Sequence, residues 1–197
     1  MNSVILSSVL QYTTPVEKGI IQLVLKNEVS NETIELLYKH SLHSGCLDLL
    51  KYLVEEANYK VKMYSYLNAA QNGHLNILQY LKDKVPVDRR ICEVAALNNH
   101  FDIVKWSYSM CYPVMTNLCY GAAYNDNFEM LRWLRERLSP WDYRVPECIA
   151  RNNNFEMFYW VCENNCPMDK WTYTTAVSYN CREIVEWIKI YKPELTL

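Results

Sequence analysis

Tryptophan recurs at a fixed interval along the second half of the chain, and proline keeps the same interval. Each step is 27 residues, at Trp106, Trp133, Trp160 and Trp187 and at Pro86, Pro113, Pro140 and Pro167. Helices and strands repeat their side-chain directions every two to four residues or so. A long interval shared by two residue types therefore indicates a tandem array of one supersecondary unit. Arrays of short units present elongated surfaces, which mostly bind other macromolecules.

Six copies of the unit can be recognised within residues 38–195, spaced by 28 and 26 residues at the start and by 27 thereafter. The clearest copies cover residues 69–81, 95–107 and 122–134, and weaker copies cover 41–53, 149–161 and 176–188. Residues 1–37 are expected to form an N-terminal cap or a degenerate repeat, with apolar positions at Val16, Ile20, Ile21, Leu23 and Leu25. Residues 1–197 are thus expected to form a single repeat domain with one continuous core.

Each copy contains two helical patterns separated by a residue that stops the first helix. The stop falls on residue types that tolerate the left-handed backbone conformation, at Gly45, Gly73, Asn99, Asp126, Asn153 and Asn180. The second pattern then places apolar residues at helical spacing, as in Leu75, Leu78 and Leu81. The expected fold class is therefore all-α, a helical repeat solenoid with short inter-repeat loops.

Three further recurring features predict how the copies join and stack. Proline is expected to stop the second helix, and an aspartate two residues later to cap the next helix, at Asp88, Asp142 and Asp169. Paired alanines such as Ala69-Ala70 are small enough to let neighbouring first helices approach closely. The gap between neighbouring second helices is expected to be filled by an aromatic residue, at Tyr52, Tyr80, Trp106, Trp133, Trp160 and Trp187.

Composition argues against several functional classes. A net charge of −2 gives no bulk attraction to nucleic acid or to an anionic membrane surface. No apolar run approaches the roughly 18 residues that a membrane span needs. Residues 1–10 do not follow the pattern of a signal peptide, so we expect a cytoplasmic protein whose eight cysteines are reduced.

No pattern in the chain predicts catalysis, a cofactor or a metal. The four glycines are isolated and form no phosphate-binding loop. His74 and His100 share one repeat position after the helix stop, where a ring is expected to hydrogen-bond backbone groups. Cys162 and Cys166 lie four residues apart, but no matching His or Cys pair lies nearby, which argues against zinc. We therefore expect neither enzymatic activity nor a cofactor.

The repeat resembles a known family. Residues 69–81 read Ala-Ala-Gln-Asn-Gly-His-Leu-Asn-Ile-Leu-Gln-Tyr-Leu, which resembles the helix–turn–helix of the ankyrin repeat. A tryptophan in the second helix followed by Ser-Pro-Trp-Asp (139–142) or Cys-Pro-Met-Asp (166–169) resembles the shortened ankyrin repeats of giant DNA viruses. This step near 27 is shorter than the usual ankyrin step of about 33 residues, and the Thr-Pro-Leu-His opening is absent. Tight loops are expected in place of β-hairpin fingers.

Comparison of the copies with one another separates scaffold from surface. Three positions of the first helix vary freely while their neighbours stay fixed, and their spacings of three and four residues place them on one helix face. The resemblance to ankyrin stacks implies that this face lines the concave side. Tyr, Trp and Arg there are residue types enriched at interface hot spots. The candidate protein-binding residues are Tyr64, Arg90, Leu97, Tyr120, Tyr124, Arg144, Arg151 and Trp171.

These features predict a non-enzymatic protein–protein interaction module, expected to be a monomer. The viral resemblance implies a host or viral protein as the partner, in the cytoplasm of the infected host. A structural or particle-associated repeat protein that self-assembles is the first alternative. Nucleic-acid binding is the weaker alternative, because Arg132, Arg135 and Arg137 alternate with Glu129 and Glu136. The remaining alternative is that the varied positions form ordinary solvated surface that binds no partner.

Overall fold

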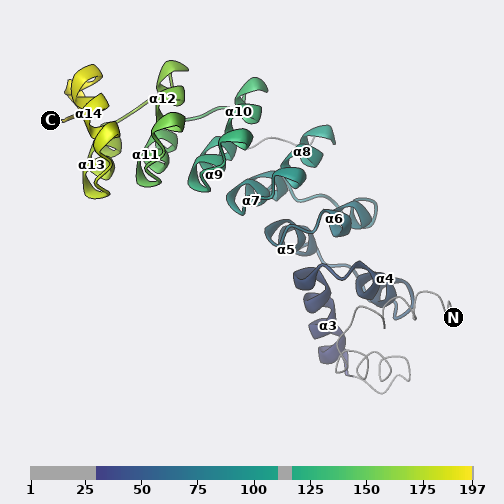
Figure 1. Ribbon diagram of the computed structural model, residues 1–197. Coiled ribbons are helices and arrows are strands. Elements are labelled where there is room, and N and C mark those ends of the chain that lie inside the picture. Colours follow the sequence, from purple (N-terminus) through teal and green to yellow (C-terminus); the bar gives the residue numbers. More distant parts are fainter. Residues whose placement is uncertain (1–29, 111–116, 197) are drawn as a thin grey trace. The chain divides into compact units, whose positions relative to one another are not determined.

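A computed structural model describes residues 30–110 and 117–196, and all the regular secondary structure in these residues is helical (Figure 1). They form the α-helices α3 to α14 and one short 3-10 helix, η1, with no strand among them. The prediction of an all-α fold is therefore confirmed. The predicted apolar positions of the N-terminal cap, from Val16 to Leu25, lie outside the described residues.

The chain divides into two compact units, Met1–Ile91 and Cys92–Leu197. The first unit contains α3 (Asn31–Ser44), α4 (Leu47–Glu55), α5 (Ser65–Gln71) and α6 (Leu75–Leu81). The second begins within α7 (Ile91–Leu97) and contains α8 (Phe101–Ser109), α9 (Leu118–Tyr124), α10 (Phe128–Glu136), α11 (Arg144–Arg151), α12 (Phe155–Glu163), α13 (Lys170–Ser178), α14 (Arg182–Tyr191) and η1 (Pro193–Thr196).

The turn inside each copy takes the predicted conformation. Positive φ occurs at all six predicted stops, Gly45, Gly73, Asn99, Asp126, Asn153 and Asn180. The amide after the stop then donates back to the carbonyl five residues earlier, for example from Asn127 to Ala122 at 2.9 Å and from Cys181 to Ala176 at 2.8 Å. This bond closes the first helix and lets the second begin at once.

The end of the second helix differs from the prediction. Helices α10 and α12 end four residues before Pro140 and Pro167, so proline does not stop them. Leu138 and Asn165 adopt a left-handed conformation, each with φ of 59°, and end these helices instead. The predicted role of aspartate is confirmed at Asp169, whose side chain accepts from the Trp171 amide at 3.1 Å.

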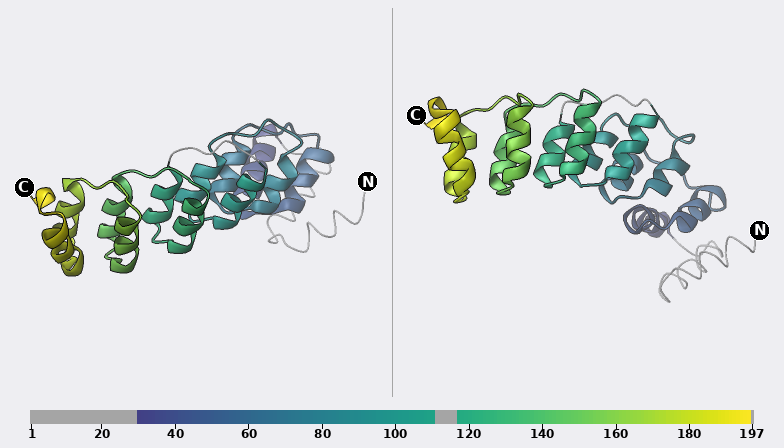
Figure 2. Two further views of the ribbon diagram at one scale, coloured as in Figure 1. Left: turned by 90° about the horizontal axis from the view of Figure 1, so that it is seen from above. Right: turned by 45° about the horizontal axis from the view of Figure 1, so that its top comes forward.

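First helices in the second unit pack closely along one row. Helix α11 contacts α9 and α13, and the views of Figures 1 and 2 show these first helices side by side. The paired alanines of α7 and α9 are fully buried, as the sequence predicts. An added Cβ on Gly121 of α9 would come within 2.9 Å of the Ala96 carbonyl carbon, so this contact needs glycine.

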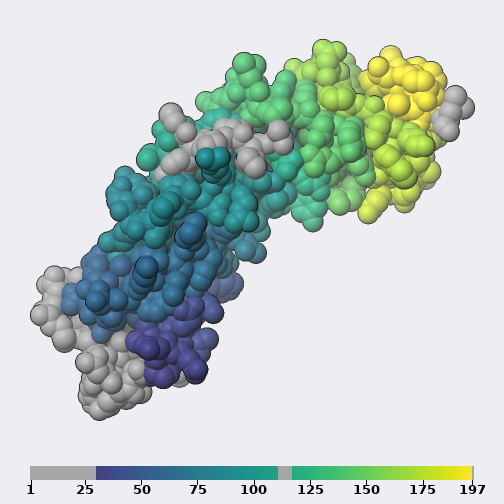
Figure 3. Space-filling model, turned by 180° about the vertical axis from the view of Figure 1, so that it is seen from behind, coloured from purple at the N-terminus to yellow at the C-terminus, as the bar shows by residue number. Residues whose placement is uncertain are grey.

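Second helices in this unit are joined by aromatic rings. Trp133 of α10 meets Phe101 and Tyr108 of α8 edge-on, with ring centroids 5.6 Å and 4.9 Å away. Trp160 of α12 meets Phe128 of α10 at 5.4 Å in the same way. The predicted filling of this gap is therefore confirmed, although both tryptophans are half-buried rather than enclosed. In the space-filling view of Figure 3, the neighbouring copies coloured from green to yellow lie in contact.

Within each unit, side chains at the turns also tie some copies to the copy before them. The side-chain amide of Asn125 donates to the backbone carbonyls of Ala96 and Leu97, at 3.1 and 3.0 Å. One copy later, the side-chain amide of Asn152 donates to the Ala123 carbonyl in the same way, at 2.9 Å. In the first unit, His74 Nε2 donates to the His43 carbonyl at 2.8 Å. The predicted role of the His74 ring is thus confirmed, and the bond reaches across to the preceding copy.

A tyrosine cluster joins α3 to the segment that leads into α5. The hydroxyls of Tyr59 and Tyr64 both donate to the Glu35 carboxylate, the second at 2.8 Å. Buried Tyr38 lies against both rings, and its hydroxyl is 2.5 Å from Ser65 Oγ. Hydrogen bonds from the Tyr59 and Tyr64 hydroxyls lower the pKa of Glu35 from its usual 4.5 to about 2, and the bond from Tyr59 has the larger effect.

This pKa shift predicts a loss of stability of the first unit in acid. A carboxyl whose folded pKa is depressed stabilises the fold above its unfolded pKa, and this contribution disappears as pH falls through the folded pKa. The urea midpoint should therefore fall between pH 4.5 and pH 2. Glu35→Gln keeps the acceptor oxygen but cannot titrate, so its midpoint should change less over the same range. Equal slopes for the two proteins would contradict the assignment.

Candidate protein-binding surface

The varied positions of the first helices are all at least partly exposed. None of the predicted binding residues is buried, and Tyr124 and Trp171 expose 46% and 58% of their surface. Tyr64 and Arg90 belong to the first unit, whereas the remaining six belong to the second. The candidate surface is therefore built within the second unit, and we call its exposed positions on α7, α9, α11 and α13 the first-helix face.

The two residues in the first unit are occupied by local contacts. The Tyr64 hydroxyl donates a hydrogen bond to the Glu35 carboxylate, as described above. The Arg90 guanidinium donates two hydrogen bonds to the Asp88 carboxylate, from Nε at 3.1 Å and from Nη2 at 2.8 Å. The backbone amide of Arg90 donates to the same carboxylate. These contacts give both side chains a role within the first unit.

Four of the predicted residues form one cluster on α9 and α11. Tyr120 and Tyr124 lie one turn apart on α9, with ring centroids 6.1 Å apart. The guanidinium of Arg144 lies 5.2 Å from the Tyr120 centroid, and that of Arg151 lies 4.8 Å from the Tyr124 centroid. Each arginine of α11 therefore covers one tyrosine of α9, at cation–π distance.

Arg144 is fixed by more than its tyrosine. It pairs with Asp142 through Nε at 3.0 Å and through a terminal nitrogen at 2.6 Å, and it also donates to the Asn117 side chain at 2.7 Å. Asn117 in turn donates to Glu93 at 2.7 Å. Because of the Arg144 side chain, the pKa of Asp142 is lowered. This chain of bonds spans α7, α9 and α11, so it orients the cluster before any partner arrives.

Arg151 differs because no carboxylate lies within ion-pair distance of it among the described residues. Its side chain borders a hollow of about 190 Å³ between α11 and α13, together with Glu147, Cys148, Thr175 and Tyr179. Drug-sized ligands need pockets of roughly 300–1,000 Å³, so this hollow fits a single side chain better than a metabolite. Leu97 lies half-buried on α7, and Trp171 extends the face onto α13.

Two exposed tyrosines beside the face were not predicted. Tyr143 exposes 47% of its surface one residue before α11, and Tyr179 exposes 58% at the end of α13. Tyr143 directly precedes Arg144, and Tyr179 directly follows Ser178, an exposed residue of α13. A comparison of copies that included flanking positions could have found them.

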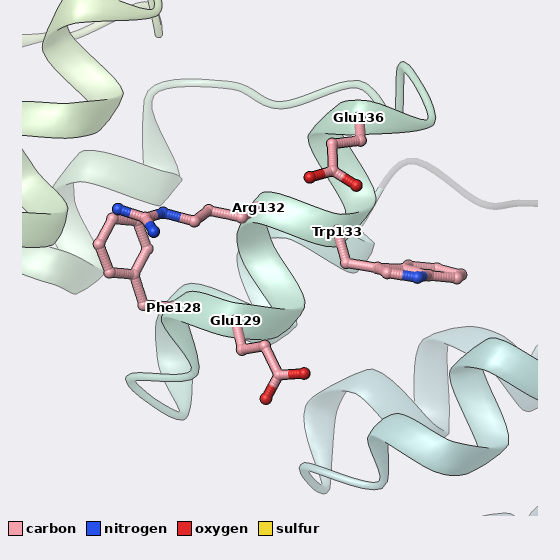
Figure 4. Close-up of a pocket in the computed structure, with 5 residues that line it drawn as sticks. All are labelled: Phe128, Glu129, Arg132, Trp133 and Glu136. Carbon is pink, nitrogen blue, oxygen red and sulfur yellow. The ribbon is translucent and has the colours of Figure 1, made fainter.

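The second helices present a different surface, on which cations and rings are paired within the protein. Figure 4 shows Arg132 lying over Phe128 while Trp133 points to the other side of α10. The Arg137 guanidinium lies 3.8 Å from the Trp133 centroid, and that of Arg135 lies 3.9 Å from Trp141. These arginines therefore pack against rings of the protein itself. Glu129 and Glu136 line a hollow of about 340 Å³ together with Phe128, Arg132 and Trp133.

The described residues hold no group of three or more His, Cys, Asp or Glu side chains placed to bind a metal. Burial raises the pKa of the Cys92 and Cys119 thiols to about 12. Both thiols are buried in the core of the second unit. Because only the thiolate is a good nucleophile, neither thiol is suited to catalysis near neutral pH.

None of the described helices has the length and apolar character needed to cross a lipid bilayer. Comparison with known proteins finds no family model and no curated protein that matches this chain.

Proposed function

We propose that this chain is a non-enzymatic, ankyrin-type repeat module that binds a protein through the first-helix face. The observation that carries the proposal is the cluster of Tyr120, Tyr124, Arg144 and Arg151, which is partly exposed yet held in place by stacking and by hydrogen bonds. Tyr and Arg provide large contact area, and a pre-oriented cluster loses less side-chain entropy on binding. The partner is a host or viral protein, met in the host cytoplasm by a monomeric module.

Two features support the ankyrin-type and viral parts of this proposal. The recurring helix–turn–helix with a left-handed residue at each turn agrees with the motif of residues 69–81. The second unit joins its copies by short segments without strands in the described part, in keeping with a shortened repeat. The viral origin is supported by the Trp-bearing second helix and the Ser-Pro-Trp-Asp and Cys-Pro-Met-Asp segments alone.

Site-specific photo-crosslinking tests the location of the binding surface. The photoreactive residue p-benzoylphenylalanine would replace Tyr124 on α9 in one protein and Glu129, exposed on α10 of the same copy, in another. After irradiation in host-cell extract, position 124 should give a discrete adduct that position 129 does not give. Wild-type protein without the photoreactive residue should prevent formation of this adduct by competition. Adducts at position 129 alone, or the same adducts at both positions, would contradict the proposal.

A further inference from the structure

Three tryptophans of the second helices in the second unit each pack against the second helix of the preceding copy, at a site that we call the seat of that tryptophan. Trp133 lies against Phe101 and Tyr108, Trp160 lies against Phe128, and Trp187 lies against Phe158 at 5.5 Å. Two positions in register, one on each helix, are buried in every one of these preceding copies. The second-helix position is Val104, Leu131 and Phe158, and the first-helix position is Ala96, Ala123 and Ala150, all with 0% exposure.

The copy formed by α13 and α14 keeps this seat but leaves it open. One step of 27 residues carries the two buried positions to Val185 and Val177. Val185 is half-exposed, and Val177 exposes 50% of its surface where Ala150 exposes none. Tyr173, in register with buried Cys119 and Pro146, is also partly exposed. All three side chains are therefore less buried than their counterparts in the preceding copies.

These side chains line a groove on the outer side of the last helix pair. This open groove has a volume of about 390 Å³, and we call it the end groove, defined by Tyr173, Val177, Arg182, Val185, Glu186 and Lys189. Its floor is the apolar pair Val177 and Val185. The short helix η1 contacts α13 and α14, yet none of its residues lines the groove.

The rim of the end groove differs from the inner seats in charge. Arg182 stands in register with Phe101 and Phe128, and Lys189 stands in register with Tyr108. No carboxylate lies within 4 Å of either cation among the residues that the structure describes. Elsewhere in this unit, a cation commonly lies over the ring that fills a seat, as Arg132 does at 5.9 Å from the Trp160 centroid. The end groove thus combines an apolar floor for a ring with a rim of two cations, Arg182 and Lys189, and one carboxylate, Glu186, which stands in register with Arg132.

We propose that the end groove binds an exposed tryptophan side chain of a partner protein, flanked by acidic residues. The indole would rest on Val177 and Val185 as Trp187 rests on Phe158 one copy earlier. Arg182 and Lys189 would stack on the ring and pair with neighbouring carboxylates. The argument is continuity with the inner seats, each of which holds a tryptophan, together with the net positive rim. This binding is separate from the first-helix face and does not depend on it.

Methyl NMR with small probes tests the end groove on the full chain. N-acetyl-tryptophan supplies the indole and one carboxylate, and N-acetyl-leucine supplies the same carboxylate without the ring. We expect N-acetyl-tryptophan to shift the Val177 and Val185 methyl signals in a saturable way, with a Kd of about 1 mM given the few atoms that contact the groove. N-acetyl-leucine should shift them weakly and without saturation. The neutral amide of N-acetyl-tryptophan should bind more weakly than the acid.

Two variants keep the test decisive. Val177→Asp places a charge on the exposed groove floor and should weaken the probe at least about tenfold, while the circular-dichroism spectrum stays unchanged. Arg182→Gln with Lys189→Gln should remove the preference for the acid over the amide. The proposal is overturned if neither probe shifts the methyl signals, or if leucine and tryptophan act alike. It is also overturned if light scattering shows a dimer that Val177→Asp dissociates, since a second copy would then fill the groove.

Discussion

Replacing Trp133 with alanine is expected to lower the free energy of unfolding of the second unit by about 2–3 kcal/mol. Truncating a fully buried aromatic residue costs roughly 3–5 kcal/mol, and Trp133 is half-buried. The ring nevertheless meets Phe101 and Tyr108 of α8 and carries Arg137 on its other side, so one truncation removes three contacts. Urea denaturation followed by circular dichroism measures the loss.

Trp171→Ala provides the matched control, because it removes the same side chain from an exposed position on α13. Trp171 exposes 58% of its surface, and no ring of another helix is placed against it in the described part of the chain. Its loss should stay within about 0.5 kcal/mol. Equal losses for the two variants would show that the rings between second helices do not hold the copies together. A broad transition for Trp133→Ala alone would instead indicate that copies on either side of it unfold separately.

The turns and the stacking scheme could be predicted because each copy repeats the same solution. A residue that must adopt positive φ leaves a strong signal in sequence, since few residue types tolerate it. Asn99 and Asn153 therefore marked the helix ends correctly. The alanine pairs and the tryptophan stripe were informative for a similar reason, because a position that packs against an identical neighbour admits few side chains.

Other features could not be predicted, since they depend on which residue happens to lie across the copy boundary. Leu138 is an unusual residue for a left-handed helix end, and its recurrence as Asn165 one copy later was hidden by the change of type. The bonds from Asn125 and Asn152 to the preceding copy look in sequence like ordinary turn asparagines. Arg132 and Arg137 read as solvated charges, whereas the structure places both over aromatic rings.

The candidate surface was predictable in position but only partly in detail. Variation among copies correctly marked exposed positions of the first helices, because scaffold positions are constrained by stacking and surface positions are not. It did not separate Tyr64, which bonds Glu35, from Tyr124, which is exposed. Nor could it anticipate that Arg144 is held by Asp142 and Asn117 while Arg151 has no carboxylate partner in the described residues. Those differences arise from side chains on neighbouring helices.

The double variant Tyr120→Ala with Tyr124→Ala is expected to weaken the proposed partner by at least about thirtyfold. Truncating one hot-spot aromatic costs about 2 kcal/mol or more, which is roughly thirtyfold in affinity. The two rings contact each other, so their effects should add only in part. Removing them also uncovers the guanidinium groups of Arg144 and Arg151 that lie over them. Calorimetry with the partner identified by crosslinking measures the change.

The control for this variant is Glu129→Ala with Glu136→Ala on the second helix of the same copy. These two carboxylates are 81% and 71% exposed, and they lie on α10, away from the first-helix face. Arg132 is unsuitable as a control because it packs over Phe128 and Trp160. Both double variants should keep the wild-type circular-dichroism spectrum, since neither touches the alanine pairs or the tryptophans. If the glutamate pair weakens binding and the tyrosine pair does not, the partner binds the second helices, and the assignment of the first-helix face is wrong.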